Sequence, residues 1–406
     1  MIRADVAVVG GGPAGAIVAA ELARRGHEVV VLERSSAWRW HACGVFSSPA
    51  TLPALRRVGL DAGTLDAAAR PIPAMRVETP GGVAFRLRYG ADGEPGPVGF
   101  DRARLDPALL ELAAAAGACV LRGARVEHVA VAAVGARLDV RDAAGANVVH
   151  ARLVIGADGG SSLVARSVGV AARPFLPRRV GLTYHLADRA GDPPADARMR
   201  VLDDGYIGVA PVPGGRVNIG IVLGRTWQRE LATRGAATVA DTIVAGVPLL
   251  DGAAGSPPDP AAWRTGARLD RVAGASPLGH RVRRRSGPGW LLVGDAAGFL
   301  DPFTGEGLHR AVVSAELAAR AADAALRGEP RALDAYDRAM RRWFLPKDGV
   351  SWLVQAFLAR PALFDYAARR LEARSGVRET MGLVMGDLVP ASRAFDPRFL
   401  AALLRP

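Results

Sequence analysis

The amino-acid sequence predicts an α/β fold in which a parallel sheet is interleaved with an antiparallel one and followed by a helical segment. Residues 4–34 read as a buried strand, a glycine turn, a helix and a second strand. Residues 173–275 alternate strand-like stretches with Gly and Pro turns, which is typical of an antiparallel sheet. From residue 331 onward, apolar residues recur at helical spacing. Because 406 residues exceed one ordinary core, we expect two intertwined domains.

The glycine turn near the N-terminus follows a strand and opens a helix. Its glycines, Gly10, Gly12 and Gly15, have the spacing G-x-G-x-x-G. Gly10 permits the tight turn, Gly12 lets the backbone approach a pyrophosphate, and Gly15 lets helix and strand pack closely. Glu33 closes the second strand, where a carboxylate can accept both hydroxyls of an adenosine ribose. Since the helix start also offers unpaired N–H groups to phosphates, the pattern predicts a Rossmann-like dinucleotide site.

Composition narrows the classes of function. The net charge of +12 comes almost wholly from arginine, because Lys347 is the only lysine. A basic surface can attract nucleic acid, anionic membranes or acidic carrier proteins. The sequence has no nucleic-acid motif, so we expect no nucleic-acid partner and favour a solvated arginine-rich surface. Two cysteines, Cys43 and Cys119, support neither a disulfide framework nor a metal site.

The sequence predicts a cytoplasmic protein, with peripheral membrane contact left open. No run of about 18 or more apolar residues lacks a charge or a glycine, so we expect no transmembrane helix. The apolar N-terminus lacks the charged region of a signal peptide. Aromatic residues near the C-terminus favour core packing, the alternatives being a lipophilic tunnel or a basic membrane-surface helix. These aromatic residues are Trp343, Phe344, Trp352, Phe357, Phe364 and Tyr366.

Local signals place further elements between these landmarks. Residues 49–58 read as a helix with Ser47 or Ser48 as its cap. The Pro80-Gly81-Gly82 sequence predicts the tip of a β-hairpin. Two more helices are expected at residues 101–117 and 232–250.

Two later stretches complete a family pattern. They are LVIGADGGSSLVARSVG, residues 153–169, and GWLLVGDAAGFLDPFTGEGLHRA, residues 289–311. With the first glycine turn, they resemble the FAD-dependent oxidoreductases of the para-hydroxybenzoate-hydroxylase-like fold, which include aromatic hydroxylases, flavin halogenases and geranylgeranyl reductases. Gly298 and Glu306 replace the His and Gln common in ring hydroxylases, as in the geranylgeranyl reductase-like branch. The halogenase signature W-x-W-x-I-P is absent.

This resemblance implies FAD as the cofactor and divides the chain. In the family, the Asp295 position bonds the ribityl hydroxyls and residues 302–307 wrap the pyrimidine side of the ring. The Arg102 position reaches the FAD phosphates, the alternative being an exposed helix arginine. The expected cofactor-binding residues are Gly10, Gly12, Pro13, Ala14, Gly15, Glu33, Arg34, Cys43, Gly44, Arg102, Val126, Asp158, Gly159, Gly294, Asp295, Pro302, Gly305, Glu306 and Gly307. The expected FAD-binding segments are 1–70, 100–172 and 276–330, with the substrate domain at 71–99 and 173–275 and helices at 331–406.

The candidate catalytic residues come from two places. Cys43-Gly44 partly matches the geranylgeranyl reductase-like branch, although Val45 stands where an acid usually follows. Cys43 is either a group that positions or protonates the substrate or a small buried loop residue. His41 is either a pocket acid/base or an ordinary loop histidine.

The stretch GYIGVAPV supplies the third catalytic candidate, Tyr206. Geranylgeranyl reductases carry Trp and Phe in the related stretch, where this chain has Gly208 and Ala210 before Pro211. Smaller residues at these positions favour a bulkier or ring-shaped substrate over a prenyl chain.

The predicted function is an FAD-dependent oxidoreductase acting on a lipophilic small molecule. The favoured reaction is oxidation or hydroxylation of a polyketide- or quinone-type ring, and the first alternative is saturation of prenyl double bonds. The second alternative is a flavoprotein that passes electrons to a protein or quinone. No second glycine fingerprint is present, so NAD(P)H is expected to reach the same flavin transiently, unless a partner protein donates the electrons.

Overall fold

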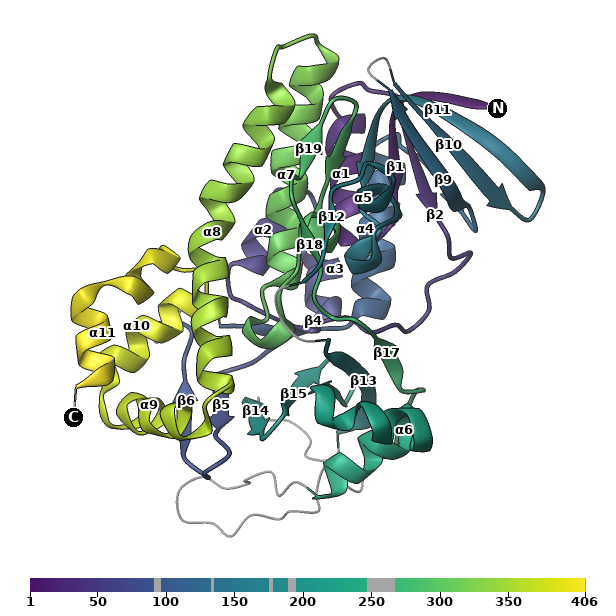
Figure 1. Ribbon diagram of the computed structural model, residues 1–406. Helices are drawn as coiled ribbons and strands as arrows, with labels where there is room; N and C mark the ends of the chain where they lie inside the picture. The colour runs from purple at the N-terminus through teal and green to yellow at the C-terminus, as the bar shows by residue number, and fades with distance from the viewer. Residues whose placement is uncertain (91–95, 133–134, 175–177, 189–194, 247–266, 406) are drawn as a thin grey trace.

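The predicted α/β class is confirmed by a computed structural model of the chain. It describes residues 1–90, 96–132, 135–174, 178–188, 195–246 and 267–405. Two large sheets lie one above the other in Figure 1, and a group of helices flanks the lower one. Each sheet takes its strands from separated parts of the chain. The exact division into the segments given above stays a prediction.

The first sheet carries the glycine turns. Its central strands run parallel, so the ends that lead into these turns meet at one edge of the sheet. β9 (Arg125–Ala132) and β10 (Gly135–Asp142) form an antiparallel ribbon that pairs with the N-terminal part of β11. The strand order is β19 (Ser286–Gly287), β20 (Trp290–Leu292), β11 (Gly145–Gly156), β1 (Ile2–Val9), β2 (Val29–Glu33) and β8 (Cys119–Arg122).

Helices cover this sheet and close the largest core. α1 (Pro13–Ala23) packs against both α4 (Arg102–Ala115) and α7 (Gly307–Leu326). The side chains of Val6, Ala7 and Val8 are fully buried beneath them. Continuous apolar strands are expected where a parallel sheet is covered by helices.

The second sheet contains the predicted hairpin. β5 and β6 pair on either side of the Pro80-Gly81-Gly82 turn, as predicted. The sheet is mixed and not purely antiparallel, because β14 runs parallel to β5. One face packs on α6 (Gln228–Gly246) through a third core. The strand order is β17 (Ala273–Ala275), β13 (Val180–Ala187), β16 (Arg216–Leu223), β15 (Gly205–Val212), β14 (Ala197–Leu202), β5 (Met75–Glu78) and β6 (Ala84–Leu87).

The helical C-terminal segment lies beside β5 and β6 (Figure 1). Its helices are α8 (Ala332–Leu358), α9 (Pro361–Ala373), α10 (Ser375–Met385) and α11 (Pro397–Leu404). Phe344 and Phe364 are buried, as core packing predicts, but Trp343 is 54% exposed and Trp352 is 38% exposed, so that prediction is wrong for these two tryptophans. Within the described residues, no helix has the length and apolarity needed to span a membrane.

Three local predictions need correction or limits. The helix at residues 49–58 is α2 (Thr51–Arg57), and its N-cap is Ala50 rather than a serine. Ser47 and Ser48 instead bond the Thr51 hydroxyl from the preceding turn. α6 is interrupted at Gly235, where φ is 78°, and residues 247–250 of the expected helix lie outside the described residues.

Shorter elements complete the fold. α3 (Ala62–Ala68) and α5 (Leu163–Ser167) connect strands of the first domain. The remaining strands are β3 (Phe46–Ser47), β4 (Ala69–Pro71) and β7 (Val98–Phe100) in a three-stranded sheet, with β12 (Ala171–Ala172) and β18 (Arg281–Val282) as a pair.

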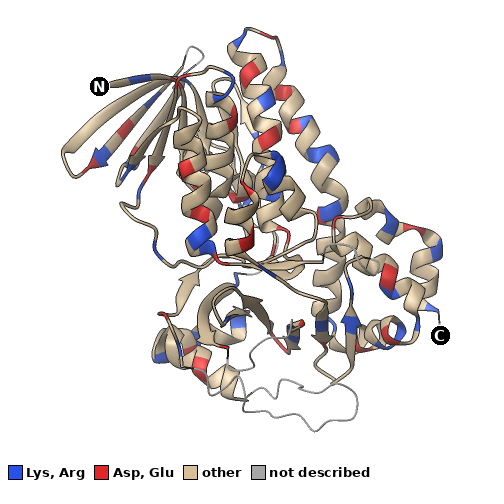
Figure 2. Cartoon of the chain, turned by 180° about the vertical axis from the view of Figure 1, so that it is seen from behind, with Lys and Arg blue, Asp and Glu red and all other residues tan. Residues whose placement is uncertain are grey.

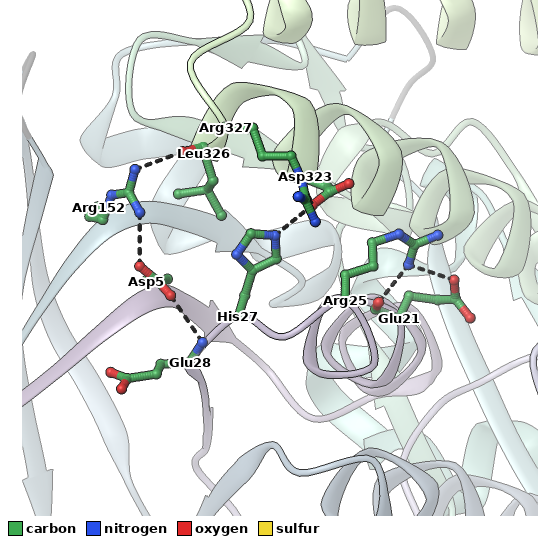
Figure 3. A network of polar contacts seen from close by, with 9 residues as sticks. All are labelled: Asp5, Glu21, Arg25, His27, Glu28, Arg152, Asp323, Leu326 and Arg327. Carbon is green, nitrogen blue, oxygen red and sulfur yellow. Dashed lines mark hydrogen bonds and ion pairs between the residues drawn. The ribbon is translucent and has the colours of Figure 1, made fainter.

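Polar contacts fasten the first sheet at the edge away from the glycine turns (Figure 3). His27 Nε2 lies 2.7 Å from Asp323 Oδ1, near the end of α7. Arg152 donates to Asp5 Oδ1 at 3.0 Å and to the Leu326 carbonyl at 2.8 Å. These contacts join the C-terminal end of α7 to the first sheet at the edge opposite the glycine turns.

Charged residues of both signs are mixed over the surface. Figure 2 shows acidic positions interspersed with basic ones along the helices seen from behind. Several exposed arginines form ion pairs within a single helix, such as Arg341 with Asp337 at 2.9 Å. This arrangement fits the solvated surface that the composition favours.

Candidate functional site

The first glycine turn has no room for a side chain at two of its glycines. A Cβ added at Gly10, whose φ is 103°, would lie 2.5 Å from the Ala157 carbonyl oxygen. A Cβ added at Gly15 would lie 2.0 Å from the Gly10 carbonyl oxygen. At Gly12 the same atom would meet open space. α1 begins there at Pro13 without a side-chain cap, so the turn can present backbone N–H groups to an anion.

Glu33 lies over this turn. Its Oε2 accepts the Gly11 N–H at 2.8 Å, and its Oε1 accepts the Ser35 N–H at 2.8 Å. The carboxylate is therefore held at the end of β2, where a ribose hydroxyl could reach it. Of the other residues predicted here, Ala14 is buried in α1, Arg34 is exposed, and Val126 is partly buried in β9.

Two more acid-glycine turns follow the neighbouring strands of the same sheet. Asp158, after β11, accepts the Leu163 and Val164 N–H groups through Oδ2. Its Oδ1 is buried and has no hydrogen-bond partner among the described residues, and Gly159 follows directly. Gly294-Asp295, after β20, forms the third turn. Burial raises the pKa of Asp295 against the opposing effect of nearby arginines.

Arg102 anchors the Cys-Gly loop. It is buried and not exposed, and its guanidinium forms a bidentate pair with Asp106 at 2.7 and 3.0 Å. Its third contact is a 2.9 Å hydrogen bond to the Gly44 carbonyl. Cys43 and Asp295 both lie close enough to affect its charge. Arg102 thus fastens the loop after β2 to the start of α4.

Cys43 keeps its proton at neutral pH. Burial raises the pKa of its thiol to about 12, although Arg102 opposes this effect. A thiol in this state can donate a proton but is a weak nucleophile. The sequence alternatives, a proton donor or a small packed residue, both fit this environment.

The loop from Pro302 to Gly307 packs against Phe46, close to the Cys-Gly loop. A Cβ added at Gly305 would lie 2.6 Å from the Phe46 ring, just after the Cys-Gly loop. α7 then begins at Gly307 with no side-chain cap. Glu306 is buried, and its Oε1 lies 3.5 Å from Lys347 Nζ. Burial raises the pKa of Glu306, and Lys347 opposes the shift.

Lys347 joins this loop to the C-terminal helices. Its ammonium donates to the Val384 carbonyl at 2.8 Å and forms an ion pair with Asp387. Asp387 also accepts the Ser48 hydroxyl at 2.7 Å, and His309 Nδ1 lies 3.3 Å from it. Burial alone would raise the pKa of Asp387, but His309 and Lys347 hold it at about 2.

Tyr206 connects the second sheet to Asp301, directly before the loop from Pro302 to Gly307. Its hydroxyl donates to Asp301 Oδ1 at 2.6 Å, and both residues are buried. Arg179 donates to Asp301 Oδ2 at 2.8 Å and to Gln355 Oε1 at 2.6 Å. Burial raises the pKa of Tyr206, and the Asp301 carboxylate raises it further. The hydroxyl is therefore a fixed donor.

The face of the second sheet away from α6 is polar at β13 and β16. Thr183 Oγ1 donates to Asn218 Oδ1 at 2.8 Å, and His185 lies opposite Asn218 in the register. Gly208 and Gly220 are paired beside them. A Cβ added at either glycine would meet nothing closer than 3.7 Å.

The predicted catalytic residues are not all brought together. His41 is exposed, and its Nδ1 lies 2.9 Å from the Arg39 carbonyl of its own loop. Among the described residues it makes no contact with Cys43 or Tyr206. The sequence interpretation missed His185, which is buried. Its ring lies 4.3 Å from the tilted Trp40 ring, centroid to centroid, and its Nδ1 lies 2.6 Å from Asp270 Oδ2. The period-2 pattern of β13 could have placed its side chain opposite the apolar face.

The three turns fit a dinucleotide with two phosphates. They follow β1, β11 and β20, which are neighbours in one sheet, and Glu33 ends the adjoining β2. The fit rests on the open space at Gly12, the uncapped start of α1 and the unpartnered Asp158 Oδ1. A model of the FAD binding domain family matches residues 3–344.

The chain belongs to this FAD-binding family. It is 32% identical over 337 residues to a menaquinone reductase of Mycolicibacterium smegmatis, covering 78% of this chain and 76% of that protein. It is 30% identical over 355 residues to digeranylgeranylglycerophospholipid reductase 1 of Methanopyrus kandleri, covering 84% and 85%. A geranylgeranyl bacteriochlorophyll reductase-like structure from Thermoplasma acidophilum shares the fold, with a TM-score of 0.75, 22% identity and coverage of 100% and 96%. The predicted resemblance to the geranylgeranyl reductase-like branch is confirmed, and the chain is an FAD-dependent oxidoreductase.

Proposed function

We propose that this flavoprotein reduces a carbon–carbon double bond in a lipophilic small molecule. When bound, reduced FAD supplies a hydride to one carbon. A proton must then reach the other carbon, and Cys43 Sγ holds one at neutral pH. The thiolate left behind would lie near the Arg102 guanidinium, whose positive charge lowers the free-energy cost of ionising Cys43. The position of Cys43, next to Gly44 whose carbonyl accepts a hydrogen bond from the buried Arg102 guanidinium, is the observation that carries this proposal.

The names of the relatives also favour a reduction. The curated relatives at 30–32% identity are a menaquinone reductase and a digeranylgeranylglycerophospholipid reductase. Each is covered over three quarters or more of its own length. This chain differs from geranylgeranyl reductases at one position that could face a substrate. It has Gly208 where their related stretch carries Trp.

A second candidate is oxygenation of a polyketide- or quinone-type ring. The paired Gly208 and Gly220 favour it, because they leave two adjacent side-chain positions empty on the sheet face. A flat ring could lie against such a surface, whereas a large aromatic side chain at residue 208 would cover it.

One experiment separates the two reactions. The purified holoprotein is reduced with dithionite without oxygen and incubated with a prenylated naphthoquinone, a geranylgeranyl lipid or an aromatic polyketide. A parallel sample is incubated in air, and all products are reoxidised before mass analysis so that quinol returns to quinone. Reduction of a carbon–carbon double bond then leaves two added hydrogens in the sample without oxygen, while oxygenation adds one oxygen atom only in the aerated sample. A Cys43→Ser variant should slow the first reaction strongly while still holding FAD. An oxygen-dependent mass gain as the sole outcome would refute the reductase proposal.

The electron donor is tested in the same system. We propose NAD(P)H as a transient reductant, because the described first sheet offers one glycine fingerprint, which FAD would occupy. Flavin bleaching by NADPH or NADH without oxygen would support this donor. Bleaching by dithionite alone would indicate a partner protein.

A further inference from the structure

His185 has the surroundings of a ligand-binding histidine. It lies on β13 on the face away from α6 and is 5% exposed. Its Nδ1 lies 2.6 Å from Asp270 Oδ2, and its backbone N–H donates to Asp270 Oδ1 at 2.8 Å. An ionised carboxylate only accepts hydrogen bonds, so the ring proton lies on Nδ1.

The second ring nitrogen of His185 is available. No hydrogen bond involves Nε2 in the part of the chain that the structure describes. Nε2 is not among the fully buried side-chain atoms that lack a partner, so this nitrogen reaches accessible space where a ligand could contact it.

The neighbours of His185 define the shape of what could bind. The Trp40 ring contacts the imidazole in a tilted arrangement, with a centroid distance of 4.3 Å and an interplanar angle of 51°. Asn218 lies opposite His185, and the next inward pair along the sheet is Thr183 with Gly220. Gly208 is paired with Gly220 on the adjoining strand. A polar corner therefore borders two paired glycines, with the Met199 side chain beside the Gly208 position.

We propose that His185 binds a hydroxyl carried on an aromatic ring of the substrate. In the tautomer that Asp270 selects, Nε2 is an acceptor, so it matches a phenol or quinol O–H. The ring would lie over Gly208 and Gly220, which leave space for a flat group. This inference rests on the proposed function, whose second candidate places a ring on this sheet face, and it narrows the substrate of either reaction to an oxygen-bearing ring.

The test compares two probes of the same shape. Binding of 1-naphthol and of 1-methylnaphthalene to the oxidised holoprotein is measured by calorimetry, without turnover. Wild type should bind 1-naphthol about tenfold more tightly, the range of one buried hydrogen bond. His185→Gln should remove that preference and leave 1-methylnaphthalene binding unchanged. The control His128→Gln changes an exposed histidine on β9 and should keep the wild-type values.

Two outcomes would overturn the inference. One is equal binding of both probes by wild type, and the other is a His185→Gln variant that keeps the preference. If that variant does not fold, Gly208→Val keeps the His185–Asp270 pair and fills the space over the paired glycines, so it should weaken both probes, and unchanged binding would place the ligand elsewhere. A naphthol preference that depends on His185 without any double-bond reduction would remove only the proposed reaction.

Discussion

Replacing Tyr206 with Phe removes one hydroxyl from the contact between the second sheet and the loop at Asp301. The donor and acceptor are 2.6 Å apart, and the Asp301 side chain is 2% exposed. A hydrogen bond to a charged group contributes about 1.5–3 kcal/mol. Asp301 would keep Arg179 at 2.8 Å and the Phe303 N–H at 3.1 Å. We therefore expect the lower part of that range, a loss of about 1.5–2 kcal/mol in the free energy of unfolding.

The chain offers a matched control for this change. Tyr184 is 1% exposed and lies in the core against α6, and its hydroxyl makes no hydrogen bond among the described residues. Tyr184→Phe removes the same atom without breaking a contact, so its effect should stay within about 0.5 kcal/mol. Asp301→Asn should cost more than Tyr206→Phe, about 3 kcal/mol, because Arg179 loses its ionised partner in a buried site.

The differences in the free energy of unfolding are measured by urea titration of wild type and the three variants. Unfolding is followed by far-UV circular dichroism and by flavin fluorescence. The two signals also show whether the sheet and the flavin loop unfold together. A Tyr206→Phe variant no less stable than Tyr184→Phe would refute the reasoning. It would mean that water or a rearranged side chain satisfies Asp301 equally well.

Three further predictions follow from single residues. Because the folded pKa of Asp387 is lowered to about 2, its stabilising effect is present above pH 4 and lost as the pH falls toward 2, so Asp387→Asn should destabilise at pH 7 and become neutral near pH 2 in urea titrations. The raised pKa of Cys43 predicts that iodoacetamide at pH 8 labels exposed Cys119 quickly and Cys43 very slowly, and rapid double labelling by mass spectrometry would contradict it. Gly99→Ala should unfold or strongly destabilise the protein, since its Cβ would lie 1.9 Å from a carbonyl oxygen, whereas Gly208→Ala should keep the wild-type melting temperature.

The first glycine turn could be predicted because its signals lie within one short stretch. Gly10 and Gly15 are set by backbone contacts that any sequence with this turn must satisfy. His185 and Asp270 could not, because 85 residues separate them and only the pairing of β13 with the following segment joins them.

The serine cap illustrates a different reason for failure. Ser47 and Ser48 have the chemistry of N-caps, but β3 takes Ser47 into a strand and Ser48 bonds Asp387 far along the chain. Local propensity was outweighed by a distant acid. The exposure of Trp343 is similar, since helical spacing alone does not say which face of α8 a neighbour covers.

The loop from Asp301 to Gly307 explains why the single lysine lies where it does. Asp301, at its start, is fixed by Tyr206 from the second sheet, while Glu306, near its end, faces Lys347 from α8. The Lys347 ammonium lies close to the Val384 carbonyl and to the carboxylates of Glu306 and Asp387, which come from different parts of the chain. An ammonium has three donors around one atom and can contact all three groups, whereas the planar fork of arginine suits one flat partner. The chain uses arginine everywhere else, so we attribute this lysine to geometry, and it fixes the loop between the sheet and the C-terminal helices.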